Sequence, residues 1–284
     1  MCVPTLAGRA LTDPRHRLGE CLSVDSHGEH APIASRHVLP DARAMNRLDP
    51  APAIPPSQLR SAVDWAVVTR RSIRAFLPAE VRRKEIEAIL DVARHAASGV
   101  NTQPWKVHVL TGAAKDRLSA AIAAVDNDAS QADSLEEPYA YYPQDWVSPY
   151  LERRRKLGWD LYGLLGIAKT DKARMHAQHG RNYRFFGAPV GLIFTIDRVM
   201  QAGSLIDYGM FLQSVMVAAR ARSLDTCPQV AFTKFHGVIA RELAIPDQEM
   251  VVCGMSLGYA DPSRVENTLV THRERVDSFT TFHN

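Results

Sequence analysis

Three arginines and a serine lie within five consecutive positions, in the segment Arg70-Arg71-Ser72-Ile73-Arg74. A guanidinium stays charged at every relevant pH and binds phosphate oxygens through paired N–H groups, and the serine hydroxyl adds another donor. From residue 60 to residue 94 the chain has eight lysines and arginines against five acids, an excess as large as the net charge of +3 of all 284 residues. Taken alone, this pattern indicates either a phosphate site or a solvated charge run.

A second cluster, Ser98-Gly99-Val100-Asn101-Thr102-Gln103-Pro104-Trp105, links an expected helix end to an expected strand. Its small residues allow the backbone to approach a flat ligand closely. Asn101 and Gln103 each offer a hydrogen-bond donor and an acceptor, which suits the edge of a heteroaromatic ring. We expect Trp105 to anchor the following strand in the core. Together the two clusters favour ligand binding over a solvated charge run.

The chain shows few residues for catalysis by the protein itself. It has no HExxH motif, no Walker loop and no strand–GxGxxG–helix unit. Cys227 has no apparent partner base, so a small buried residue at a turn is favoured over a nucleophile, and Cys253 is expected in the core. His176 and His179 are expected to be a surface pair rather than zinc ligands. A reaction would then rely on a bound cofactor.

Periodic apolar patterns indicate the elements that must position these residues. We expect Ser57 to cap the first helix, a loop over 70–78, and Ser204 to cap a helix that continues to Arg222. The other expected elements are helices over about 80–96 and 113–125, strands over 105–110, 189–196 and 250–257, and a helical, basic stretch over 149–178. Three strands among helices without strict alternation indicate an α+β fold.

The composition is that of a globular protein, with 46% hydrophobic, 23% charged and 7% aromatic residues. It excludes a disordered chain, and a net charge of +3 is too small for a dedicated nucleic-acid binder. No run of 18 apolar residues exists, so we expect no membrane span. The four cysteines form no CxxC pair and are too few for a disulfide scaffold. We expect a cytoplasmic protein.

Residues 1–56 differ from the rest of the chain, because they contain eight of its seventeen prolines and show no sustained apolar period. We expect an extended or disordered arm there. Two interpretations stay open: the first 44 residues are an annotation artefact with Met45 as the true start, or the arm wraps a dimer partner. Residues 57–284 would form the folded domain.

The two polar clusters, in this order, resemble those of the nitroreductase family of FMN flavoproteins. Farther along, Asp225-Thr226-Cys227-Pro228-Gln229 is similar to the family's segment beside the flavin ring, and Met250–Tyr259 is similar to its last core strand. Arg273 lies where the family has a late phosphate-binding arginine. The resemblance covers residues 57–280, and four motifs in this order and spacing make it specific.

The resemblance implies an α+β fold with a central, mainly antiparallel sheet flanked by helices, in an intertwined homodimer with two FMN sites at its interface. Residues 70–74 would bind the phosphate, ribityl chain and pyrimidine edge, with the charge of Arg74 stabilising the reduced, anionic flavin. The partner subunit would contribute Ala97, Ser98, Gly99 and Asn101. Residues 228–230 would line the ring with a backbone N–H near flavin N5. The implied flavin-binding residues are Arg70, Arg71, Ser72, Arg74, Ala97, Ser98, Gly99, Asn101, Gln103, Pro228, Gln229, Val230 and Arg273.

The implied activity is FMN-dependent oxidation of NAD(P)H, with ping-pong hydride transfer through flavin N5 to a small aromatic acceptor, either a nitroaromatic or a quinone. This chemistry requires no catalytic residue of the protein and no metal. Four alternatives stay open. They are reductive dehalogenation of halophenols with Glu152 and Lys156 gripping an amino-acid zwitterion, oxygen-dependent flavin cleavage, flavin binding without turnover, and nucleic-acid binding by the arginine-rich segment.

Residues 126–182 are expected to be an insertion in the folded domain, first polar and turn-rich, then basic. We expect residues 139–182 to form a substrate lid, because aromatic side chains recur in this irregular stretch. The basic run Arg153–Lys156 would attract an acidic substrate such as a nitrobenzoate or, as is more common, form a solvated helix face. The aromatic residues of the expected lid are Tyr141, Tyr142, Trp146, Tyr150 and Trp159.

Overall fold

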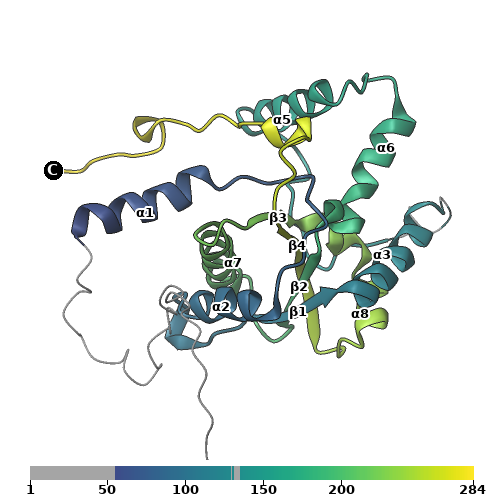
Figure 1. Cartoon of the computed structure of the whole chain (residues 1–284), viewed down its shortest axis with the longest axis horizontal. Helices are drawn as coiled ribbons and strands as arrows, with labels where there is room; N and C mark the ends of the chain where they lie inside the picture. The colour runs from purple at the N-terminus through teal and green to yellow at the C-terminus, as the bar shows by residue number, and fades with distance from the viewer. Residues whose placement is uncertain (1–54, 129, 131–134) are drawn as a thin grey trace, which may run out of the picture. The chain divides into compact units, whose positions relative to one another are not determined.

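The computed structural model describes residues 55–128, 130 and 135–284. The arm expected over residues 1–56 lies outside these residues, apart from its last two positions. Figure 1 shows the helices and strands of the described part.

Four strands form one antiparallel sheet in the order β1-β2-β4-β3. The two central strands are buried along nearly their whole length. Since both faces of the sheet are covered, these strands are apolar in almost every position rather than in every second one. The strands are β1 (Lys106–Thr111), β2 (Val190–Asp197), β3 (Asp225–Gln229) and β4 (Glu249–Gly258).

Seven helices of the described residues surround or extend from this sheet (Figure 1). They are α1 (Pro56–Thr69), α2 (Arg83–Ala93), α3 (Gly112–Asp126), α5 (Tyr150–Leu164), α6 (Lys172–Gly180), α7 (Ser204–Arg220) and α8 (His236–Leu243). Short 3₁₀ turns include η1 (Gly99–Asn101), η2 (Arg181–Gly187), η3 (Val230–Phe235), η4 (Val265–Thr268) and η5 (Val276–Ser278).

Helices α2 and α7 cover one face of the sheet, and α3 and α8 cover the other (Figure 1). Side chains of β2 alternate between the two cores: Leu192 and Phe194 point to the α2–α7 side, whereas Ile193 points to the α3–α8 side. Each of these four helices turns buried apolar side chains toward the sheet, as Ile86 and Ile89 of α2 illustrate. The expected α+β class with an antiparallel, helix-flanked sheet is confirmed.

Both expected serine caps are wrong. Pro55 is the N-cap of α1, and Pro56 occupies the first helical position, where its fixed φ and missing N–H are tolerated. Ser57 therefore lies inside the helix. Gly203 is the N-cap of α7, so Ser204 is its first residue, and neither helix has a side-chain capping bond.

The helical, basic stretch expected over 149–178 consists of two helices. Gly166 adopts a φ of +60° and ends the first, since glycine takes the left-handed conformation without strain. The Arg174 side chain of α6 donates to the carbonyls of Leu165 and Gly166, at 3.1 and 2.8 Å. Asp171 caps α6 by accepting from the backbone N–H of Arg174 at 3.0 Å. The chain therefore turns back between α5 and α6.

Two elements were missed in the sequence, β3 and α8. Strand β3 is only five residues long and contains Pro228, which a strand tolerates at the edge of a sheet. Helix α8 has eight residues, too few for a clear period. The helix expected over 80–96 is real but shorter, running from Arg83 to Ala93.

Candidate functional site

The arginine-rich loop, residues 70–76, lies along the open edge of β3. The backbone N–H of Ile73 donates to the carbonyl of Thr226 at 3.1 Å, and Ser72 forms a parallel bridge with the same residue. Ile73 and Ala75 are buried, whereas the alternating residues Ser72 and Arg74 are partly exposed. Because side chains alternate along an extended chain, burial of one set presents the other to the surface. The sequence thus folds the loop so that its polar side chains line one side.

Arg70 and Arg273 form the cationic centre of this region. Burial is the main reason why the pKa of Arg70 lies below its usual value, and the nearby charge of Arg273 lowers it further. The Arg70 guanidinium contacts the Met216 sulfur of α7 at 4.0 Å. No carboxylate among the described residues contacts it. Arg273, which the chain brings from near its C-terminal end, donates to its own neighbours Thr271 and His272. Two converging guanidiniums without an acid fit a phosphate.

Arg71 is exposed and lies near Asp225 at the start of β3. Burial raises the pKa of Asp225, and the charges of Arg220 and Arg71 partly oppose this rise. Arg220 also donates to Asp225 at 3.1 Å. An acid therefore already accompanies Arg71, unlike Arg70, which makes Arg71 the weaker phosphate ligand of the two.

Cys227 is buried beneath the loop. Burial raises the pKa of its thiol to about 11, although the charges of Arg74 and Arg70 and the hydroxyl of Ser72 oppose the rise. The thiol is thus neutral at physiological pH and is no nucleophile. The expected small buried residue is confirmed, but it lies within β3 rather than at a turn. Cys253 is also buried, as expected.

The Gln229 side chain cannot reach a ligand directly. It is 3% exposed, its Oε1 accepts from the Ser256 hydroxyl at 2.6 Å, and its Nε2 donates to the Asn182 carbonyl at 2.8 Å. Pro228 is exposed and Val230 is half-buried. The 228–230 segment can therefore offer a ligand its backbone and the Pro228 ring. The local sequence carried no signal for Asn182 or Ser256, since both act from distant segments.

Ser256 also belongs to a pattern that formally matches GxSxG, in Gly254-Met255-Ser256-Leu257-Gly258. A nucleophile elbow places its serine on a sharp turn between a strand and a helix. Here the serine is fully buried in the middle of β4 and donates to Gln229. Ser256 is a structural residue that fixes the shape of the 228–230 segment.

The 98–103 cluster lies elsewhere on the chain. The Gly99 N–H donates to the Asp207 carboxylate in the first turn of α7 at 3.2 Å. Met216, which contacts Arg70, follows nine residues later, about 14 Å farther along a helix. The structure thus does not bring this cluster to the arginine-rich loop of the same chain.

The cluster nonetheless has an unusual shape. Val100, Asn101 and Gln103 have φ values of 45°, 61° and 47°, in the left-handed region that side chains other than glycine rarely adopt. Val100 is 99% exposed, and Ala97, Asn101 and Gln103 are exposed too. Ser98 stabilises the turn by accepting from the Gln103 N–H at 3.1 Å. Strain in an exposed loop is typical of functional segments.

Trp105 follows this cluster, and its ring stacks on Phe211 of α7 with centroids 4.7 Å apart. It packs against the α2–α7 core, so the expected anchoring role is confirmed.

The expected lid aromatics fall into two groups. Tyr142 contacts both Tyr141 and Trp146, and the Arg154 guanidinium lies 4.7 Å from the Trp146 ring. Tyr150 and Trp159 are exposed on α5. The lid role stays a prediction.

The basic run on α5 is partly neutralised. Arg153 pairs with Glu274 at 3.0 Å and Lys156 with Asp160 at 2.8 Å. The Arg153–Glu274 pair ties α5 to the segment that carries Arg273. Half of the run thus serves as a paired helix face.

His176 is exposed and lies 3.8 Å from Asp126. In the described part of the chain, no cluster of three or more His, Cys, Asp or Glu side chains could hold a metal ion. None of the helices in this part is long and apolar enough to cross a membrane.

The fold and the site define an α+β protein with a phosphate-fitting cationic site at the edge of an antiparallel sheet. Residues 67–259 match the model of the nitroreductase family, so the chain belongs to this family. The resemblance seen in the motifs is thereby confirmed.

Two relatives align along most of their length. The chain is 48% identical over 219 residues to a 4-nitrobenzoate reductase of Pseudomonas putida, covering 77% of this chain and 94% of that protein. It is 41% identical over 220 residues to a nitrobenzene nitroreductase of Ectopseudomonas oleovorans, covering 78% and 96%. Among solved structures, the FMN-dependent nitroreductase NfnB from Mycobacterium smegmatis, in complex with NADPH, is 30% identical with a TM-score of 0.74, covering 80% of this chain and all of that one.

Proposed function

We propose that the protein is an FMN-dependent NAD(P)H oxidoreductase that reduces nitroaromatic acceptors. The observation that carries the proposal is the half-buried Arg70 beside Arg273, two cations without a carboxylate partner in the described structure. The activities named for the similar proteins support it, since one is a 4-nitrobenzoate reductase and another an FMN-dependent nitroreductase with bound NADPH.

The residues present fit FMN. Arg70, Arg273 and Ser72 supply charge and a hydroxyl for the phosphate, and Arg74 supplies a cation for the pyrimidine edge. A positive charge held there favours the negative charge that accumulates on reduction. When bound, FMN supplies the redox chemistry by accepting hydride from NAD(P)H and passing electrons to the acceptor. The chain binds and orients, and the neutral thiol of Cys227 takes no part.

A homodimer would complete this site. A symmetric dimer can place the 98–103 cluster of one subunit beside the arginine-rich loop of the other, which one chain does not achieve. Large apolar side chains are exposed on α1 and α7, as expected for a protein interface. They are Leu59, Val63, Trp65, Val67, Val68, Ile206 and Met210.

Light scattering tests the dimer and should give twice the 31.5 kDa mass of one chain. Met210→Glu, on the exposed face of α7, should shift the protein toward monomers and weaken FMN binding. Val109→Glu on the edge strand β1, a residue of similar exposure, is the matched control and should leave both unchanged. A monomeric parent that binds FMN tightly would refute the shared site.

Turnover tests the activity. NADH or NADPH oxidation should be measured with 4-nitrobenzoate, nitrobenzene, a quinone and a halophenol as acceptors. We expect turnover with the nitro compounds. Halide release from the halophenol alone would indicate a dehalogenase, and retained FMN without turnover would indicate a binding protein. The two residues considered for binding an amino-acid zwitterion already have partners within the chain. Glu152 accepts from the Ser148 hydroxyl at 2.6 Å, and Lys156 pairs with Asp160. These contacts do not favour dehalogenase activity.

A further inference from the structure

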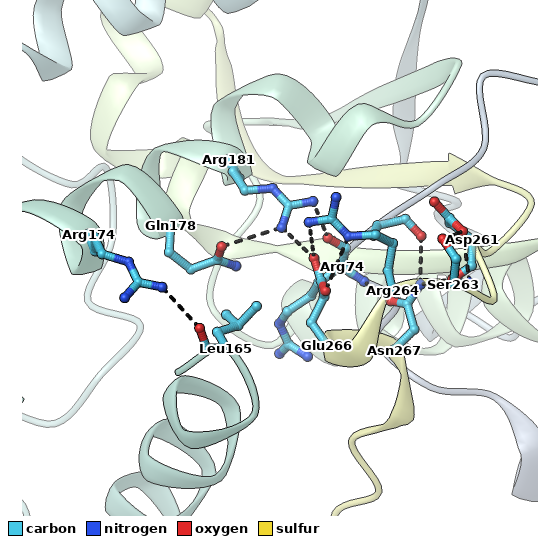
Figure 2. Close-up of polar contacts among 11 residues, drawn as sticks. Arg74, Leu165, Arg174, Gln178, Arg181, Asp261, Ser263, Arg264, Glu266 and Asn267 are labelled. Carbon is cyan, nitrogen blue, oxygen red and sulfur yellow. Dashed lines mark hydrogen bonds and ion pairs between the residues drawn. The ribbon is translucent and has the colours of Figure 1, made fainter. Parts of the chain in front are cut away.

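Glu266 is a deeply buried acid next to the arginine-rich loop. It is 1% exposed and lies in the 3₁₀ turn η4, after β4. Its Oε1 binds Arg181 at 2.6 Å and Arg264 at 3.0 Å (Figure 2). Burial by itself would raise the pKa of Glu266, but the hydrogen bonds from Arg181 and Arg264 outweigh it and hold the pKa below its usual value. The carboxylate is therefore charged at neutral pH.

Arg181 extends this ion pair to Arg74. While one nitrogen of Arg181 binds Glu266, the other donates to the backbone carbonyl of Arg74 at 2.9 Å. Figure 2 shows the Arg181 guanidinium joined to both by dashed lines. Arg181 comes from the start of η2, 107 residues away from Arg74 in sequence.

Asn267, the neighbour of Glu266, holds the same stretch from its other side. Its Oδ1 accepts from the backbone N–H of Arg74 at 2.9 Å, and its Nδ2 donates to the Ala75 carbonyl at 2.8 Å. Both backbone polar groups of Arg74 are thus bound by side chains of distant segments. A strand neighbour normally fills this role, but the loop has only isolated bridges at Ser72 and Phe76.

We propose that Glu266, Arg181 and Asn267 are positioning residues, which fix the backbone of Arg74 so that its charge is held where FMN is reduced. The inference rests on the proposed function, because it assigns Arg74 to the pyrimidine edge. Glu266 neutralises Arg181, and Arg181 and Asn267 hold the backbone. A charge stabilises developing negative charge most when its position is fixed beforehand. The three residues would act through the Arg74 backbone rather than by contacting FMN.

Two conservative variants separate positioning from packing. Arg181→Lys and Arg264→Lys both keep a positive charge, and both alter a partner of Glu266. Only Arg181 also donates to the Arg74 backbone, so Arg264→Lys is the matched control. The readouts are the Kd for FMN, from titration of the FMN-free protein, and the midpoint potential of the bound flavin.

Arg181→Lys should raise the Kd for oxidised FMN about tenfold, which is the loss of one hydrogen bond of ordinary strength. Reduced FMN should lose about tenfold more affinity, which corresponds to a midpoint potential lower by about 30 mV for two electrons. Arg264→Lys should change the Kd less than about twofold, which corresponds to a change of less than about 10 mV in the midpoint potential. Asn267→Ala should shift the Kd and the midpoint potential in the same direction as Arg181→Lys. It replaces Arg181→Lys in the test if that variant does not fold.

Equal shifts in Arg181→Lys and Arg264→Lys, or a lower Tm without a change in Kd or potential, would overturn the proposal. Arg74→Gln distinguishes failure of the positioning role from failure of the proposed function. If the parent does not bind FMN, the proposed function fails and the inference with it. If Arg74→Gln lowers the potential but neither Arg181→Lys nor Asn267→Ala does, only the positioning role fails.

Discussion

Replacing Arg70 by glutamine should separate FMN binding from folding. In the free protein the Arg70 guanidinium is half-buried, and the charge of Arg273 is close enough to lower its pKa. A lowered pKa for a cation means that the folded state disfavours its charge, so this charge opposes folding. Arg70→Gln should therefore leave the Tm of the FMN-free protein unchanged or raise it.

The same substitution should weaken FMN binding. A hydrogen bond to a charged group contributes about 1.5–3 kcal/mol, and each 1.4 kcal/mol is a factor of ten, so the Kd should rise about ten- to hundredfold. Arg273→Gln should have the smaller effect, because Arg273 is exposed and already donates to Thr271. Part of the aliphatic stem that packs near Met216 is kept in glutamine, which limits the loss of packing.

The assay is a titration of the FMN-free protein, followed by flavin fluorescence, with thermal unfolding of the same sample. Riboflavin, which lacks the phosphate, is the ligand control, and its Kd should not change in Arg70→Gln. Arg82→Gln is the protein control, since Arg82 is an exposed residue before α2 and reaches Glu85 only at 3.9 Å.

Three results would refute the reasoning. An unchanged Kd for FMN in Arg70→Gln would show that Arg70 does not contact the phosphate. An equal loss for riboflavin and FMN would show that Arg70 supports the ring or the fold instead. A clear fall in the Tm of the FMN-free protein would contradict the electrostatic argument.

Two further predictions concern stability. Gly254→Ala should lower the free energy of unfolding by about 1–3 kcal/mol, because a Cβ there would lie 2.3 Å from the buried ring of Phe232. The control Gly237→Ala has open space on α8 and should be neutral or stabilising. Equal effects of the two substitutions in thermal unfolding would contradict the packing argument. Since the pKa of Glu266 is lowered in the fold, its contribution is present above about pH 4.5 and is lost as the pH falls through the folded pKa. Glu266→Gln should cost about 3–5 kcal/mol at neutral pH and flatten the acid side of the stability profile, and an unchanged profile would show that Glu266 contributes no such term.

The candidate site could be proposed from the sequence where its residues are neighbours along the chain. Residues 70–74 and 98–103 are short runs whose chemistry is visible without the fold, and their order carried the family resemblance. The central strands were also predictable, because a short apolar run such as 190–196 is typical of a strand whose two faces are both covered.

The contacts that shape the site were not predictable, because each joins distant segments. Gln229 was assigned to the flavin, yet the residue is buried and its side chain is held by Asn182 and Ser256. The link from Glu266 to the arginine-rich loop has no local signal, since it runs through Arg181, which is 85 residues away. The serine caps failed for a local reason, because the proline pair starts α1 two positions earlier than expected and Gly203 starts α7 one position earlier.

The central claim is that FMN held by this chain carries electrons from NAD(P)H to a nitroaromatic acceptor. An anaerobic titration of the FMN-loaded protein tests it most directly. The account predicts that NADPH or NADH bleaches the flavin absorbance near about 450 nm, and that 4-nitrobenzoate added afterwards restores it. Absorbance that neither nucleotide changes, or that no nitroaromatic restores, would contradict the account.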